Sequence, residues 1–316
     1  MLRVELNSHH KLRCVCKSWN AALKSPHFYQ ERKRLRISEQ RICMLQEIDG
    51  CNRVAVYVLE KNSYKVLPPV PTIINSICHC HFVKQKLVLI PFYLADSAKN
   101  CVWLYDFACS TWRRGAKMPR WLNAFASAAD EDGGLIYVGG GLDRLYIGSA
   151  VRSASVYNVE EDKWDLLPDM NTYMEPYPTG VFAEGKFYVM GYSDSIEVFD
   201  SYTRNWKTTE NRFKSWHYVS AFGRFYCLSG RGLIEYDYSQ DKLHFLGSLP
   251  TEDWARLIDF AVVIRNKIFV HRDMILAQDF CMLEPPSETG GTFKLTGIEA
   301  LLGFQGFAMY AATLDL

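Results

Sequence analysis

Residues 130–170 read DEDGGLIYVGGGLDRLYIGSAVRSASVYNVEEDKWDLLPDM, and three short runs of strand-forming residues follow one another in them. The first run, residues 135–138, is apolar and lies between two glycine clusters. The second run, residues 154–159, alternates in polarity and ends in an acidic turn, and the third begins at Trp164. Runs of β-forming residues bounded by glycine and turn residues predict neighbouring antiparallel strands. The stretch therefore predicts one small antiparallel sheet.

An aromatic pair in this stretch recurs along the chain, which indicates a repeat. Tyr157 and Trp164 stand seven residues apart across the turn, so their rings can face each other on neighbouring strands. Four further pairs have the same spacing, the last of them weaker: Tyr57/Tyr64, Tyr105/Trp112, Phe199/Trp206 and Tyr236/Leu243. Their first members lie 37 to 52 residues apart. This is the period of propeller repeats, in which several sheets must stack to bury their faces.

Residues 130–170 resemble the kelch repeat, which has a glycine pair, a Tyr and a Trp in this order. The resemblance is strongest over residues 124–170 and continues in weaker form over 178–250. It implies a mainly β fold, a six-bladed kelch-type β-propeller over residues 41–316. A propeller closes its ring to hide the edges of its sheets. Because the first blade lacks an innermost strand, we expect residues 306–314 to pair with it and to close the ring.

Composition limits the classes of function that the chain can have. Its 316 residues are 48% hydrophobic and 14% aromatic, enough for a sizeable core, and the net charge is +1. A near-neutral chain has no global field that would recruit nucleic acid or a membrane, and we expect neither as a partner. The ten cysteines are scattered, without a signal-peptide pattern before them. We therefore expect reduced thiols and a cytoplasmic and/or nuclear protein, monomeric outside its complexes.

Residues 1–40 differ from the rest and predict two helices. Residues 10–23 have an apolar stripe that contains Leu12, Val15, Cys16 and Trp19, the pattern of an amphipathic helix. Ser25 and Pro26 then favour the start of a second helix. The basic run 32–36 that follows is interpreted as a solvated helix face, and contact with nucleic acid or a nuclear signal is the alternative.

The segment LRCVCKSWNAALKSPHF, residues 12–28, resembles the second half of an F-box. The resemblance implies docking on a Skp-type adaptor, and through it on a cullin, by Leu12, Val15, Cys16 and Trp19. An F-box starts with a Leu-Pro segment and a further helix, which this sequence does not contain. We therefore expect residues 1–40 to be a partial, truncated F-box. The alternative for residues 10–23 is a helix that only packs on the propeller.

The candidate catalytic and metal-binding patterns are weak. Cys78-His79-Cys80-His81 contains metal-binding residue types, but alternate side chains of a strand point to opposite faces, so the four cannot converge on one ion. No nucleophile elbow or zinc-protease motif occurs in the sequence. We therefore expect no enzyme, no catalytic residue, no metal and no cofactor. A copper-radical oxidase, which some propellers with a similar repeat are, is the least favoured alternative.

A recognition surface is expected on the loops at one mouth of the propeller. Loops rich in Trp, Tyr and Arg resemble binding hot spots, and the excess of Arg favours an acidic or phosphorylated target segment. The expected target-binding residues are Arg120, Asn123, Asp143, Arg144, Tyr177, Trp216, His217, Arg231, Trp254, Arg256 and Arg272. For the tryptophans, a half-buried position between blades is an equally good interpretation.

By resemblance, the chain is the substrate-recognition subunit of an SCF-type (Skp–cullin–F-box) E3 ubiquitin ligase of the plant F-box/kelch type. The F-box would bind the adaptor, and the propeller would hold an unidentified target for ubiquitination and degradation. The alternative is a kelch-propeller scaffold or decoy that binds its target but does not recruit the ligase, because its F-box is incomplete.

Overall fold

The fold is mainly β, as predicted, with three short helices before the first strand. The computed structural model describes residues 9–35, 40–48, 51–58, 61, 63–71, 78–92, 100–107, 110–143, 149–174, 177–191, 193–210, 217–221, 224–229, 232–237, 242–248, 258–264, 267–274, 277–284, 292, 294–297 and 307–315.

Six four-stranded antiparallel sheets make up the described part of the β region, and we call them blades 1 to 6. Blade 1 contains β27 (Phe307–Asp315), β1 (Gln40–Ile48), β2 (Cys51–Val58) and β3 (Ser63–Val66). Blade 2 contains β4 (Cys78–Val83), β5 (Lys86–Pro91), β6 (Cys101–Asp106) and β7 (Thr111–Lys117). Blade 3 contains β9 (Ala126–Asp130), β10 (Leu135–Gly139), β13 (Ala154–Asn158) and β14 (Lys163–Leu167).

The remaining blades have the same strand order. Blade 4 contains β15 (Thr179–Ala183), β16 (Lys186–Met190), β17 (Ser195–Asp200) and β18 (Asn205–Glu210). Blade 5 contains β19 (His217–Ala221), β20 (Arg224–Ser229), β21 (Gly232–Asp237) and β22 (Lys242–Gly247). Blade 6 contains β23 (Ile258–Ile264), β24 (Lys267–Met274), β25 (Ala277–Glu284) and β26 (Lys294–Gly297). A small three-stranded sheet joins β8 (Leu122–Asn123), β11 (Leu142–Asp143) and β12 (Ser149–Ala150).

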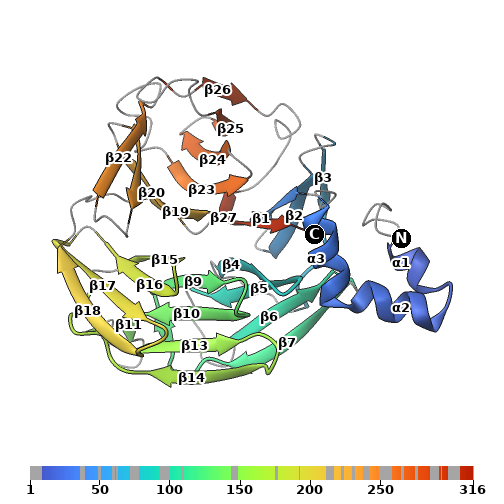
Figure 1. Cartoon of the computed structure of the whole chain (residues 1–316), viewed down its shortest axis with the longest axis horizontal. Helices are drawn as coiled ribbons and strands as arrows, with labels where there is room; N and C mark the ends of the chain where they lie inside the picture. The colour runs from blue at the N-terminus through green and yellow to red at the C-terminus, as the bar shows by residue number, and fades with distance from the viewer. Residues whose placement is uncertain are drawn as a thin grey trace.

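The first-named strands of the six blades contact one another in order around a circle. β4 contacts β9, β9 contacts β15, and the contacts continue through β19, β23 and β27 back to β4 (Figure 1). β27, from the C-terminal end of the chain, pairs antiparallel with β1, with Cys43 opposite Ala312. Two distant parts of the sequence thus share blade 1.

The seven-residue aromatic step corresponds to one position in the blades. In blades 1 to 5 the two residues of each pair are direct cross-strand partners on the third and fourth strands, which confirms the predicted pairing. The ring centroids are 5.0 Å apart for Tyr105 and Trp112, and 5.2 Å apart for Phe199 and Trp206. Contacts of this kind between large rings stabilise neighbouring strands of a sheet.

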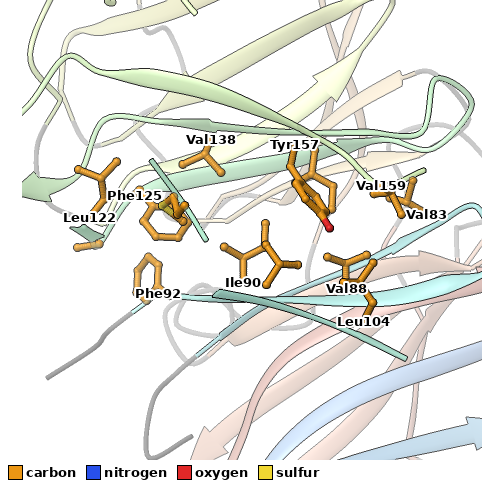
Figure 2. Close-up of a cluster of buried hydrophobic side chains, with 14 residues drawn as sticks. Val83, Val88, Ile90, Phe92, Leu104, Leu122, Phe125, Val138, Tyr157 and Val159 are labelled. Carbon is orange, nitrogen blue, oxygen red and sulfur yellow. The ribbon is translucent and has the colours of Figure 1, made fainter. Parts of the chain in front are cut away.

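The hydrophobic core is divided into clusters between consecutive blades. One cluster joins blades 2 and 3, and Figure 2 shows Val88 and Ile90 of blade 2 on one side of it and Val138 and Tyr157 of blade 3 on the other. All four of these side chains are buried. Since each sheet needs its neighbour to cover its face, the packing between blades provides the apolar burial that stabilises the fold.

The N-terminal helical part differs from the prediction of one helix over residues 10–23. It contains α1 (His9–Arg13), α2 (Lys17–Lys24) and α3 (Pro26–Arg34), so the predicted helix is broken at Cys14–Cys16. The backbone of Cys16 is extended, with φ −161° and ψ 166°, and this residue begins α2 as its N-cap. The helices lie outside the circle of blades (Figure 1). No helix in the described ranges is long and apolar enough to cross a membrane.

Candidate functional site

The turn between α1 and α2 presents an apolar side chain to solvent. The amide of Val15 donates a hydrogen bond to the carbonyl oxygen of Leu12 at 3.1 Å, which draws these two predicted adaptor residues together. The Val15 side chain is 61% exposed, and Leu12 is half-buried. Arg13 Nε donates to Asn20 Oδ1 at 2.9 Å and fixes α1 against α2. The turn therefore holds the Val15 side chain in an exposed position.

Cys16 and Trp19, the other two predicted adaptor residues, lie at the start of α2. The Cys16 thiol is exposed, and its Sγ lies 3.0 Å from Ser18 Oγ. Hydrogen bonds from the Ser18 side chain and from the Trp19 and Ser18 amides lower the pKa of this thiol. Trp19 is half-buried. Because the helix is broken before α2, the four residues do not form the continuous helical stripe that the sequence predicted.

The three helices have a small core of their own. Leu23 and Phe28 are buried, and the ring of His9 meets Phe28 edge to face with centroids 5.5 Å apart. Arg32 is only 2% exposed, so the interpretation of the basic run 32–36 as a solvated face is wrong for this residue. Arg34 is exposed and paired with Glu31 at 2.9 Å. Of this run, Arg34 thus has a partner within α3, and Arg32 is buried.

The loops expected to bind a target leave the blades at one end. In blade 3, Ala126, Gly139, Ala154 and Leu167 lie opposite one another at the same end of the four strands. The segments before β9, between β10 and β13, and between β14 and β15 therefore meet at this end, which we call the loop end of the blades. Turns such as residues 131–134 and 159–162 lie at the opposite end.

Three of the predicted target-binding side chains lie at the loop end with at least partial exposure. Arg120 is exposed, Asp143 is half-buried in β11, and Tyr177 is 59% exposed. The structure corrects the prediction that Asn123 contacts a target, because Asn123 is only 1% exposed. It lies in β8, where Gly141 (φ +92°) packs so closely that an added Cβ would lie 2.6 Å from the Asn123 carbonyl oxygen.

The other predicted target-binding residues are not all in loops. His217 begins β19, and Arg272 lies within β24, which extends to Met274 and is longer than predicted. The remaining ones lie outside the described residues: Arg144, Trp216, Arg231, Trp254 and Arg256.

Sequence reasoning missed three residues at the loop end. Tyr173 is 64% exposed, and the Arg152 guanidinium carbon lies 5.4 Å from the centre of its ring. Glu197 is fully buried and accepts hydrogen bonds from residues 171 and 172, which begin the same loop. An aromatic residue in a loop between blades was the available signal for Tyr173, and nothing in the sequence distinguishes Glu197 from a solvated strand residue.

The Cys78–His81 segment has its side chains on alternate faces of β4, as predicted. Cys78 and Cys80 are buried in the cluster between blades 1 and 2. His81 Nε2 lies 2.7 Å from Ser127 Oγ of blade 3, and His79 packs on Phe92 and Phe125. Burial lowers the pKa of His79 to about 3, with a contribution from His81, and burial lowers that of His81 to about 4. In the described part of the chain, no group of three or more His, Cys, Asp or Glu side chains is arranged to hold a metal ion.

Comparison with known families agrees with this arrangement of short helices followed by blades. The F-box domain matches residues 1–31, and the kelch motif matches residues 127–171, which correspond to blade 3. The F-box/kelch-repeat protein At1g15670 of Arabidopsis thaliana is 28% identical over 289 residues, which cover 80% of this chain and 79% of that protein.

Two further Arabidopsis thaliana proteins are similar over shorter stretches. The F-box/kelch-repeat proteins At1g80440 and SKIP30 are 29% and 28% identical. Each match covers 65% of this chain, with 64% and 61% of the respective relatives. The chain thus combines an F-box with a kelch motif, and over most of its length it is similar to F-box/kelch-repeat proteins of plants.

Proposed function

We propose that the chain is the substrate-recognition subunit of an SCF-type ubiquitin ligase. The observation that carries this proposal is the F-box at residues 1–31 in one chain with kelch blades. The helical part, residues 1–40, docks on a Skp-type adaptor that is bound to a cullin, and the blades of residues 41–316 hold the target. The exposed Val15 in the turn before α2 supports docking at this place, since a partner that covers an exposed apolar side chain gains hydrophobic stabilisation.

On this proposal the chain positions a target and makes no covalent bond itself. A target held on the blades is presented to the ubiquitin-conjugating enzyme at a high effective concentration, as in any tethered reaction. The chemistry belongs to other subunits of the ligase. The similarity to F-box/kelch-repeat proteins, which are non-catalytic ligase components, supports this role.

Reconstitution with purified subunits tests the proposal. The full chain is mixed with a cullin N-terminal domain, with and without a Skp-type adaptor, and the complexes are separated by size-exclusion chromatography. We expect the cullin to co-elute with the chain only when the adaptor is present, and Val15→Asp to abolish this complex. Leu166→Asp is the matched control, because Leu166 is 62% exposed on β14 of blade 3. A folded wild-type chain that forms no complex would support the scaffold or decoy function instead.

A further inference from the structure

Two tyrosines at the loop end expose most of their side chains. Tyr173 and Tyr177, both in the segment between β14 and β15, are 64% and 59% exposed. Tyrosine offers a large, rigid surface with a polar tip, which is why it is frequent in binding sites. Two such rings in one loop are therefore a candidate contact surface.

The beginning of this loop is held by a buried carboxylate. Glu197, in β17, accepts a hydrogen bond from the Asn171 amide at 2.8 Å and one from Thr172 Oγ1 at 3.0 Å. It also accepts one from Thr208 Oγ1 at 2.6 Å, which ties the loop to β18. A buried carboxylate is retained when several donors satisfy it, and here the donors fix the loop beside Tyr173. Because these hydrogen bonds order residues 171 and 172 before binding, this part of the loop loses less entropy when a partner arrives.

The guanidinium of Arg152 packs on the ring of Tyr173. Its guanidinium carbon lies 5.4 Å from the ring centre, a cation–π distance, and Arg152 Nη1 donates to the Asn171 carbonyl oxygen at 3.3 Å. Within the described ranges Arg152 forms no ion pair with a carboxylate. Its remaining N–H groups are therefore suited to a carboxylate of a partner, which a guanidinium binds in a bidentate manner.

Tyr177 is held in a backbone conformation that residues other than glycine rarely adopt. Its φ is +65°, in the left-handed region. Its amide donates to the Ala124 carbonyl oxygen at 3.3 Å, and its ring lies 6.0 Å from that of the buried Phe92. Strained residues of this kind persist where their surroundings enforce them, and they concentrate at functional sites. These contacts place the Tyr177 ring beside Phe92 at the loop end, where Tyr177 remains 59% exposed.

We propose that Tyr173, Tyr177 and Arg152 form a docking surface for a target segment in which an apolar side chain is adjacent to Asp or Glu. The tyrosine rings contact the apolar side chain, and the guanidinium of Arg152 binds the carboxylate. Arg120, exposed on the segment that precedes Ala124, adds positive charge at the loop end without a carboxylate partner in the described part of the chain. Asp169 is the exposed acidic residue at the start of the same loop, and it opposes an acidic segment. The inference rests on the proposed function, because it names the chemistry of the target.

Selection from a random-peptide phage library tests this inference with the full chain as bait. We expect the selected peptides to be enriched in Asp or Glu next to Leu, Ile or Phe. A synthetic peptide of the selected sequence is then titrated into the variants. Tyr173→Ser and Arg152→Gln should each weaken the affinity of the chain for this peptide by about 10-fold or more. Asp169→Asn should leave binding unchanged or strengthen it. Tyr202→Ser is the matched control, because Tyr202 is 86% exposed in the turn at the opposite end of blade 4.

Three outcomes would overturn the inference: selection of no peptide, selection of neutral or basic peptides, or binding that survives Tyr173→Ser and Arg152→Gln. Adaptor binding by the same variants separates this result from the proposed function. Variants that lose the peptide and still bind the adaptor support both proposals. A chain that binds the acidic peptide through Tyr173 and fails to bind the adaptor supports the docking surface and contradicts the ligase function.

Discussion

The indole Nε1–H of Trp206 in blade 4 donates a hydrogen bond to the carbonyl oxygen of Pro168, at the end of blade 3, with a distance of 2.8 Å. Trp112 of blade 2 makes the same hydrogen bond, also 2.8 Å, to Pro68 at the end of blade 1. The repeat tryptophan therefore has two roles at these junctions. It packs on the aromatic residue of its own blade and links that blade to the preceding one.

Trp206→Phe should destabilise the protein by about 0.5–1.5 kcal/mol more than Trp164→Phe does. Both substitutions replace an indole by the smaller phenyl ring at equivalent repeat positions, but only the substitution at Trp206 removes a hydrogen bond. Trp164 Nε1 is buried and has no hydrogen-bond partner among the described residues, so Phe removes an unsatisfied donor there. Urea unfolding of the two variants measures the difference. Equal losses would show that the link to Pro168 does not contribute to stability.

A carboxylate links blades 2 and 3, the junction where Trp164 makes no such hydrogen bond. Asp162 Oδ2 accepts from Arg113 Nη1 at 2.6 Å, and Oδ1 accepts from the Ala116 amide at 2.8 Å and from Tyr157 Oη at 2.5 Å. Burial opposes ionisation of Asp162, but these three hydrogen bonds outweigh it and hold the pKa of the carboxyl below its ordinary value. An added Cβ at Gly115 would lie 2.9 Å from Asp162 Oδ1, so the glycine leaves room for the link.

Asp162→Ala should reduce the free energy of unfolding by about 2 kcal/mol, because it leaves the Tyr157 hydroxyl and the Ala116 amide without their acceptor. A double-mutant cycle with Arg113→Ala should assign less than about 1 kcal/mol to the partly exposed ion pair. Asp165→Ala is the control, since Asp165 forms an exposed pair with Lys163. If the two aspartate variants were equally stable, Asp162 would be an ordinary turn residue.

The protein should lose stability as the pH falls below about 6.5, in part through His79 and His81. Burial lowers the pKa of His79 to about 3 and that of His81 to about 4 in the folded state. The unfolded chain therefore takes up protons in this range before the folded one does, and protonation favours unfolding. His79→Phe should reduce the pH dependence of the unfolding free energy between pH 7.5 and pH 5 by up to about 1.4 kcal/mol per pH unit. An unchanged slope in the variant would exclude this role.

Deletion of residues 307–316, which contain β27 (Phe307–Asp315), should expose the edge of β1 and destabilise the protein. β27 pairs with β1 along most of its length, and β4 and β23 contact it from the neighbouring blades. A free strand edge promotes association between molecules. Thermal unfolding and light scattering should show a lower melting temperature and soluble oligomers or aggregates. A monomeric deletion variant of unchanged melting temperature would contradict the place of β27 in the circle of blades.

The blades could be predicted from the sequence because their signal is local and repeated. The Tyr157–Trp164 step spans one turn. The same seven-residue spacing therefore sets the pairing of the third and fourth strands in each copy. The break at Cys14–Cys16 could not be predicted, because the apolar spacing of residues 12–19 fits one continuous helix equally well.

The polar contacts between blades and the arrangement of the loop end could not be predicted from the sequence, for a different reason. The Asp162–Arg113 pair and the Glu197–Thr172 hydrogen bond join residues 49 and 25 positions apart, and composition gives no indication of which acidic residue will be buried. Asn123 resembled an exposed loop residue, but close packing of Gly141 on its backbone places it in a buried strand.

Titration of a purified Skp-type adaptor into the full chain by isothermal calorimetry tests the central claim most directly. The ligase-receptor function predicts saturable one-to-one binding with a dissociation constant of about 1 μM or tighter, weakened about 10-fold or more by Trp19→Ala. Circular dichroism of the variant shows whether the blades remain folded. No binding by the folded wild-type chain at adaptor concentrations of about 100 μM would contradict the function as a ligase subunit.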